Sequence, residues 1–243
     1  MKYGSKSKIL LAAIVCATVA VTSFAQTGEV YSLNVVGFQK VSALASGGLV
    51  LSSTPFDRDA ANLDNVLGTN GIAASTLGLA DNCLMYDKYT QSYLIYWLFS
   101  HTNPSLNRHW RSASGLATNV NLLPGQGFWF RNRASSDATL VMAGDVVDVG
   151  AVTNLIVPGL QMMSYPFSTS IRMTDMNLTN GVAGTTLGLA DNIMIYVPTN
   201  QSFNIYWLFS HTNPALNRKW RSSAGLATNV FVQPGQGFWY RSR

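Results

Sequence analysis

The chain has 243 residues, of which 47% are hydrophobic, and a formal net charge of +5. Charged residues make up only 11% of it, against about 25% in an average globular protein, and Ser, Thr, Asn and Gly take their place. The hydrophobic content is enough for the core of one or two domains. The scarcity of charge disfavours a helical cytosolic enzyme and favours β-structure outside the cell.

The N-terminus has the parts of a secretory signal peptide. A cationic start at residues 1–8 is followed by the apolar run 9–21, and Ser23 and Ala25 are the small residues of a cleavage site. We therefore expect residues 1–25 to be removed, leaving a soluble secreted chain at the cell surface or outside a bacterium, or in its periplasm. The apolar run is too short to span a bilayer, and no later stretch is long enough, so no transmembrane segment is expected.

Removal of this leader changes the charge balance. It takes away three lysines and leaves 13 basic and 11 acidic residues, a net charge of +2. Because nucleic-acid binding depends on a strong basic surface, we expect no nucleic-acid partner.

The two cysteines do not form a disulfide in the mature chain. Cys16 lies inside the apolar run after Val15, where attachment of a lipid needs a small residue, so a lipid anchor is disfavoured. Cys83 is then left without a partner, and we expect it to be a small buried hydrophobic residue rather than a reactive or intermolecular thiol.

After the leader, short apolar segments alternate with turn residues, a pattern typical of an all-β protein. Turns are expected at Asn103-Pro104 and at 124–127, and one short helix at 60–67. The predicted strands of the first part of the chain are 48–54, 83–86, 93–99, 109–112, 128–133 and 137–145. Because the strand at 93–99 is apolar throughout, we expect both of its faces to be buried.

The second part of the chain repeats the first. Residues 71–133 align with 181–243 without a gap, and about two-thirds of the positions are identical. The repeat predicts strands at 161–165, 193–197, 203–209, 219–222 and 238–243. We expect two tandem β-barrel or β-sandwich modules, a first one at 26–144 and a second one at 145–243. Identity is complete in 95–104, IYWLFSHTNP, which indicates constraint by packing or by function.

The two copies differ at their ends. The strand at 137–145 has no counterpart after Arg243, so the second module is expected to have an open edge that invites strand pairing. The expected donor is the segment 29–38, EVYSLNVVGF. Its assembly residues are Glu29, Val30, Tyr31, Leu33, Val35 and Val36. Donation within the chain would close a monomer, whereas donation to the next chain would build a fibre.

The leader, the segment 31–38, Ser53-Thr54-Pro55-Phe56-Asp57 and the run PGQGFWFR at 124–131 together resemble uncharacterised exported β-rich repeat proteins of Verrucomicrobia-type bacteria. The resemblance spans most of the mature chain. It implies a location in the cell envelope or outside the cell, and it offers no catalytic residues.

Candidate catalytic and metal-binding residues do not form a recognisable constellation. A Ser-His-Asp hydrolase could be drawn from Ser100, His101 and Asp81, but residues adjacent on a strand point apart and no nucleophile-elbow motif is present. The mature chain has three histidines and one cysteine without paired spacing, so no metal site and no cofactor are expected. We expect a protein that is not an enzyme, with these side chains capping turns.

Arginine and tryptophan alternate late in each copy, a mixture that stacks on sugars, binds carboxylate or sulfate, or docks a neighbouring subunit. The candidate binding or interface residues are Trp97, Arg108, Trp110, Arg111, Trp129, Arg131, Trp207, Arg218, Trp220, Arg221, Trp239 and Arg241. Alternatively, the tryptophans fill a β core and the arginines pair with aspartates at its edges.

These observations lead to two functional hypotheses. The first is a structural protein of the cell surface whose main partner is itself, forming an oligomer, a filament or a layer. The second is a bivalent, lectin-like protein that binds a polysaccharide through two equal sites.

Overall fold

The computed structural model describes residues 35–243. The predicted signal peptide at 1–25 lies outside these residues. The fold is all-β, with 43% of residues in strands and 5% in helices, as the composition and the turn spacing predicted.

Two six-stranded antiparallel sheets form most of the fold. The strands of the first sheet are β2 (Leu49–Ser53), β4 (Asn82–Asp87), β5 (Ser92–Leu98), β6 (Trp110–Ser112), β7 (Gly115–Leu116) and β8 (Gly127–Arg131). Those of the second sheet are β10 (Gly159–Ser164), β12 (Asn192–Val197), β13 (Ser202–Phe209), β14 (Lys219–Ser222), β15 (Gly225–Leu226) and β17 (Gly237–Ser242).

Both sheets have the same strand order. The first runs β2-β8-β4-β5-β6-β7 and the second β10-β17-β12-β13-β14-β15. The predicted strands lie within two residues of observed ones, and within the two six-stranded sheets only the two-residue strands β7 and β15 were not predicted. The sequence repeat is therefore matched by a repeat of strand order.

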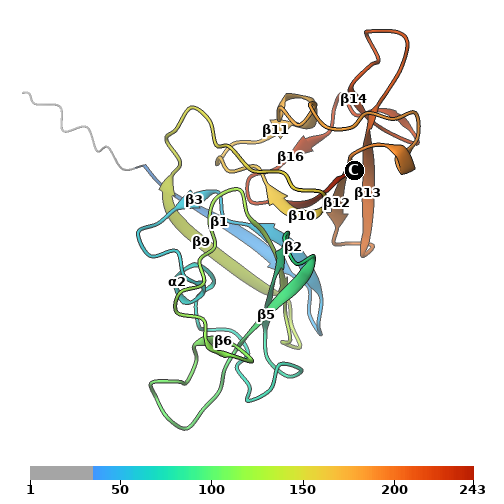
Figure 1. The fold of residues 1–243 in the computed structure, drawn as a ribbon. Helices are drawn as coiled ribbons and strands as arrows, with labels where there is room; N and C mark the ends of the chain where they lie inside the picture. The colour runs from blue at the N-terminus through green and yellow to red at the C-terminus, as the bar shows by residue number, and fades with distance from the viewer. Residues whose placement is uncertain (1–34) are drawn as a thin grey trace, which may run out of the picture. The chain divides into compact units, whose positions relative to one another are not determined.

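A third, smaller sheet lies over the first sheet, and we call it the covering sheet. It contains β1 (Val36–Ala43), β9 (Ala138–Val146) and β3 (Phe56–Asp57) in the order β1-β9-β3. Figure 1 shows β1 and β9 running side by side, in register from the pair Val36 and Asp145 to the pair Ala43 and Ala138. The predicted final strand is thus confirmed as β9.

Three short elements complete the fold. The predicted helix is α2 (Leu63–Leu67), which Asn62 caps by accepting a hydrogen bond from the Asn65 backbone N–H at 3.0 Å. The second copy has two 3₁₀ turns, η1 (Met173–Asp175) and η2 (Leu187–Leu189), and a pair of two-residue strands, β11 (Ile171–Arg172) and β16 (Phe231–Val232). Within residues 35–243 none of the sheets closes into a barrel, so the barrel alternative was wrong.

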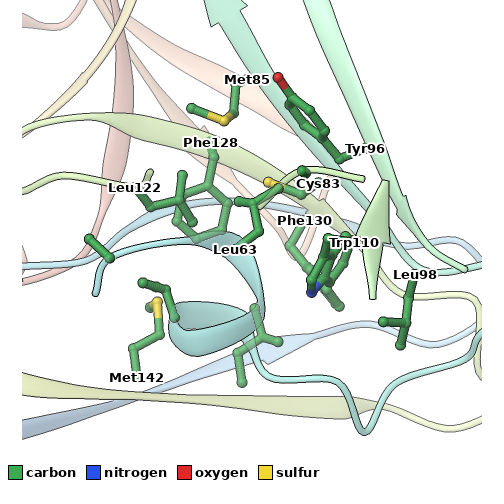
Figure 2. Close-up of a cluster of buried hydrophobic side chains, with 14 of the residues drawn as sticks. Leu63, Cys83, Met85, Tyr96, Leu98, Trp110, Leu122, Phe128, Phe130 and Met142 are labelled. Atoms are coloured by element: carbon green, nitrogen blue, oxygen red, sulfur yellow. The ribbon is translucent and has the colours of Figure 1, made fainter. Parts of the chain in front are cut away.

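The first core lies between the first sheet, the covering sheet and α2. Figure 2 shows Leu63 from α2 and Met142 from β9 beside the aromatic residues Trp110, Phe128 and Phe130 of the first sheet. Alternate residues of β1 and β9 face this core, because side chains along a strand point to opposite faces. The covering sheet thus removes one face of the first sheet from water.

The second core is built from the corresponding residues of the second sheet. Trp220, Phe238 and Tyr240 are its largest buried side chains, and Met173 of η1 packs against them. No strand pair like β1 and β9 lies over this core in the described part of the chain. The two sheets are alike in order but unequally covered.

Candidate functional site

The twelve predicted arginines and tryptophans occupy different environments. Two tryptophans are core residues, since Trp110 is 2% exposed and Trp220 is 0% exposed. The indole N–H of Trp110 donates to the carbonyl of Gly68 at 2.8 Å, while that of Trp220 has no acceptor among the described residues. A ligand on the surface would not reach either indole, and the core alternative holds for this pair.

A second pair of tryptophans packs between the two sheets, each against the opposite one. The ring of Trp129 lies 4.7 Å from that of Tyr196, and Trp239 lies 4.8 Å from Tyr86, both edge to face. These rings form one buried cluster with Leu51. The aromatic strand after the PGQG turn therefore joins the two sheets of the same chain.

Backbone hydrogen bonds also join the two sheets, one in each direction. Ser53 N–H donates to the carbonyl of Gly235 at 2.9 Å, and Ser164 N–H donates to that of Gly125 at 3.0 Å. At Gly237 a Cβ would lie 2.8 Å from the carbonyl oxygen of Ser52, so the close approach of the two sheets requires a glycine there.

The remaining tryptophans form stacks with arginine at the edge of each sheet. Trp97 on β5 is directly opposite Arg111 on β6. The guanidinium carbon of Arg111 lies 5.3 Å from the centre of the Trp97 ring and 4.4 Å from that of Phe99. The imidazole of His101 follows at 5.3 Å from Phe99. We call these four side chains the first stack.

The second sheet carries the same arrangement, which we call the second stack. Arg221 lies 5.3 Å from Trp207 and 4.3 Å from Phe209, and His211 lies 5.2 Å from Phe209. Sequence reasoning named the tryptophans and arginines of both stacks but missed Phe99, Phe209 and the two histidines as their neighbours. The signal was the spacing of 97, 99 and 101, which places all three side chains on one face of an extended chain.

The other candidate arginines have structural contacts or none. Arg108 donates to the carbonyls of Thr69 and Gly71, at 2.9 and 3.0 Å, and Arg218 makes the equivalent bonds to Thr179 and Gly181. Arg131 donates to the Gly47 carbonyl at 3.3 Å. Arg241, exposed on β17, has no side-chain hydrogen bond to the described residues.

The aspartates of the Ala-Asp-Asn turns hold the backbone. Asp81 accepts hydrogen bonds from the N–H groups of Arg133 at 2.7 Å and Ile72 at 2.9 Å. Burial raises the pKa of its carboxyl, and these two hydrogen bonds oppose that rise. Both oxygens of Asp81 accept backbone N–H groups, and His101 Nδ1 accepts from Asn103 N–H at 3.0 Å, so no hydrogen bond joins Asp81 to His101 among the described residues.

The second copy differs here by one hydroxyl. Tyr240, which replaces Phe130, donates to Asp191 Oδ2 at 2.6 Å in the core. Burial raises the pKa of Tyr240, and its hydrogen bond to Asp191 raises it further. Cys83 is fully buried without a disulfide partner among the described residues, as expected, and burial raises the pKa of its thiol.

The predicted donor segment lies only partly within the described residues. The carbonyl of Val35 accepts from Val146 N–H at 2.8 Å, and Val36 pairs with Asp145. These two residues therefore pair with β9 in the first copy rather than with the second sheet. Glu29, Val30, Tyr31 and Leu33 lie outside the described residues.

The strand at 93–99 is less buried than its apolar sequence predicted. Leu94 is 45% exposed, and Tyr93 and Ile95 are also exposed at the start of β5. The reason is that the second sheet covers β4 and β8 but reaches β5 only in part. Both faces are buried only toward the end of the strand, at Leu98 and Phe99.

Sequence reasoning missed a second site, a cavity of about 590 Å³ beside the second core, which we call the open groove. Its walls include the loop 150–154 and the side chains of Tyr165, Phe167, Ile171 and Leu178. If the two copies are aligned so that Gly48 matches Gly159, the loop is matched with β1. This alignment would have indicated that the second copy has a loop where the first has a strand.

The described residues hold no group of three His, Cys, Asp or Glu side chains that could bind a metal. Within residues 35–243 no helix is long and apolar enough to cross a membrane. No protein-family model, no curated protein and no solved structure matches the chain.

Proposed function

We propose that the protein is an exported structural subunit that self-associates, with an extended strand of one copy seated in the open groove of the next. The proposal takes the two sheets as the cores of the two tandem modules predicted at 26–144 and 145–243. It rests on one observation, the unequal covering of two sheets that share strand order and sequence.

Phe56 and its counterpart Phe167 illustrate this difference. Phe56 on β3, which pairs with β9, is 4% exposed, and its side chain packs where Gly37 of β1 lies opposite Gly144 of β9. A Cβ at Gly37 would clash with the Phe56 ring, so the close packing of this ring against β1 requires a glycine. Phe167 is half-buried in the wall of the open groove, and no strand within residues 35–243 pairs with it.

The loop that corresponds to β1 is also unpaired. Residues 147–157 belong to no strand, although they correspond to β1 and the turn after it. Val149 is 54% exposed, and its counterpart in β1 is Phe38. Apolar side chains and unpaired backbone groups of this kind favour the addition of a strand from another chain.

The donor in this proposal is the segment 29–33 of a second copy. Val35 and Val36 are engaged with β9, which leaves Glu29, Val30, Tyr31 and Leu33. Five extended residues span about 17 Å, the length of an average strand. Because donor and acceptor are different surfaces, this contact repeats from copy to copy and builds a filament.

The test compares a chain that starts at Gln26 with one that starts at Asn34, which keeps all of β1. Light scattering and negative-stain microscopy should show growing oligomers or filaments for the first and monomers for the second. Val152→Pro tests the acceptor, since it removes a backbone N–H from a loop outside the sheets, and Val152→Ala is its matched control. A chain from Gln26 that stays monomeric at all concentrations, or assembly that survives the deletion, would contradict the proposal.

A further inference from the structure

The two stacks carry an inference of a different kind. Each holds an arginine over two neighbouring aromatic rings, with a histidine beside the second ring, near the edge of a six-stranded sheet. All three ring residues of each stack lie within the run IYWLFSHTNP, which is identical in the two copies. The geometry repeats to within about 0.1 Å at each of the three contacts.

The arginines have hydrogen-bonding capacity to spare. Arg111 Nε donates to the Ser112 carbonyl at 3.1 Å, and the buried Arg221 Nε has no acceptor among the described residues. No hydrogen bond from an Nη atom of either residue to a protein group occurs within residues 35–243. The one ion pair in this part of the chain joins His109 to Asp64, so neither guanidinium has a carboxylate partner.

The aromatic rings fix the position of these guanidinium groups. A guanidinium packed over aromatic rings is held in place by them and keeps N–H groups available for an acceptor. Such N–H groups match the two oxygens of a carboxylate or sulfate in bidentate geometry, and little side-chain freedom is lost on binding.

The histidines add an oriented donor. The Nδ1 atom of His101 accepts from Asn103 N–H at 3.0 Å, and His211 makes the same bond to Asn213. In the neutral imidazole the proton then lies on Nε2, which is free to donate. In the second copy a cavity of about 620 Å³ opens over Phe209, His211 and Arg221, with Thr185, Ser210 and Thr212 around it.

We propose that the two stacks are equal binding sites for the oxyanion groups of an acidic polysaccharide. The guanidinium N–H groups bind a carboxylate or sulfate, and the imidazole Nε2 and the neighbouring hydroxyl groups bind sugar hydroxyls. A polymer that reaches both sites gains avidity, so loss of one site weakens binding by more than half. This inference does not depend on the open groove.

The experiment measures binding of the chain from Gln26 to polygalacturonate, dextran sulfate and neutral dextran by affinity electrophoresis. Retardation by polygalacturonate, by dextran sulfate or by both is expected, and the two acidic polymers distinguish a carboxylate from a sulfate ligand. Arg111→Gln or Arg221→Gln should weaken binding about 10-fold, and the double variant about 100-fold or more. Arg241→Gln removes the same charge from an exposed arginine outside the stacks and should change it less than 2-fold.

Two further variants separate the site from its structural role. Arg111→Lys together with Arg221→Lys keeps the charge but removes the paired N–H donors of the guanidinium, and should lose most of the binding. His101→Gln together with His211→Gln alters exposed side chains and should weaken binding at least 3-fold without affecting the sheets. Equal retardation by neutral dextran, no retardation by either acidic polymer, or a double arginine variant that folds and binds normally would overturn the proposal.

Discussion

The first and second sheets share strand order and aromatic core, yet the first is covered by β1 and β9 and the second is open beside Phe167. The shared part contains hairpins and also distant pairs, such as Leu49 with Arg131. The covering sheet is likewise formed by a distant pair, Val36 with Asp145. Distance along the chain therefore does not separate the two copies: within residues 35–243 the six-stranded sheet occurs in both, and the covering strands occur only in the first.

The largest effects should come from the two core tryptophans. Trp110→Ala and Trp220→Ala should each lower the free energy of unfolding by roughly 3–5 kcal/mol, because both leave a large cavity. Trp110→Phe should cost about 1 kcal/mol more than Trp220→Phe, since only Trp110 donates to a carbonyl. Urea unfolding of the four variants tests this, and equal costs for the two Phe variants would mean that the Gly68 bond contributes nothing.

Substitutions in the contact between the two sheets should lower stability equally, whichever sheet carries them. Trp129→Ala and Trp239→Ala should each cost about 3 kcal/mol and separate one thermal transition into two, because each ring packs on the opposite sheet. Differential scanning calorimetry gives both values. A large effect from only one of the two would show that the contact is not reciprocal.

Tyr240→Phe removes the hydroxyl group that distinguishes Tyr240 from its counterpart Phe130. It should cost roughly 1–3 kcal/mol, because buried Asp191 loses a hydrogen-bond donor. Because the folded state raises the pKa of Tyr240 above the unfolded value of about 10, its contribution is present below pH 10 and is lost as the pH rises further. The free energy of unfolding should therefore change less between pH 8 and pH 11 in Tyr240→Phe than in the wild type. An equal change in both would assign the loss of stability at alkaline pH to other groups.

The smallest effects should come from the arginines that hold the loops. Arg108→Ala and Arg218→Ala should each cost about 1 kcal/mol or less, because their bonds to carbonyls lie at the exposed surface. Thermal unfolding measures the cost. Losses above about 2 kcal/mol would mean that these loops are part of the folding core.

Sequence reasoning predicted the strands because turn residues and apolar alternation are local signals. It could not place Val36, because pairing of β1 with β9 depends on which distant edge is free. It also treated the tryptophans as one set, although Trp110, Trp129 and Trp97 have the core, the opposite sheet and an arginine as neighbours. These neighbours are set by the face of the strand and by the second sheet, which alternation alone does not specify.

The central claim is that the open groove receives a strand from another copy. Amide hydrogen exchange of residues 149–153 and 167–168, followed as protein concentration rises, tests it most directly. The account predicts that these amides become protected in parallel with assembly, while β1 and β9 are protected at every concentration. Assembly without added protection at these positions would contradict it.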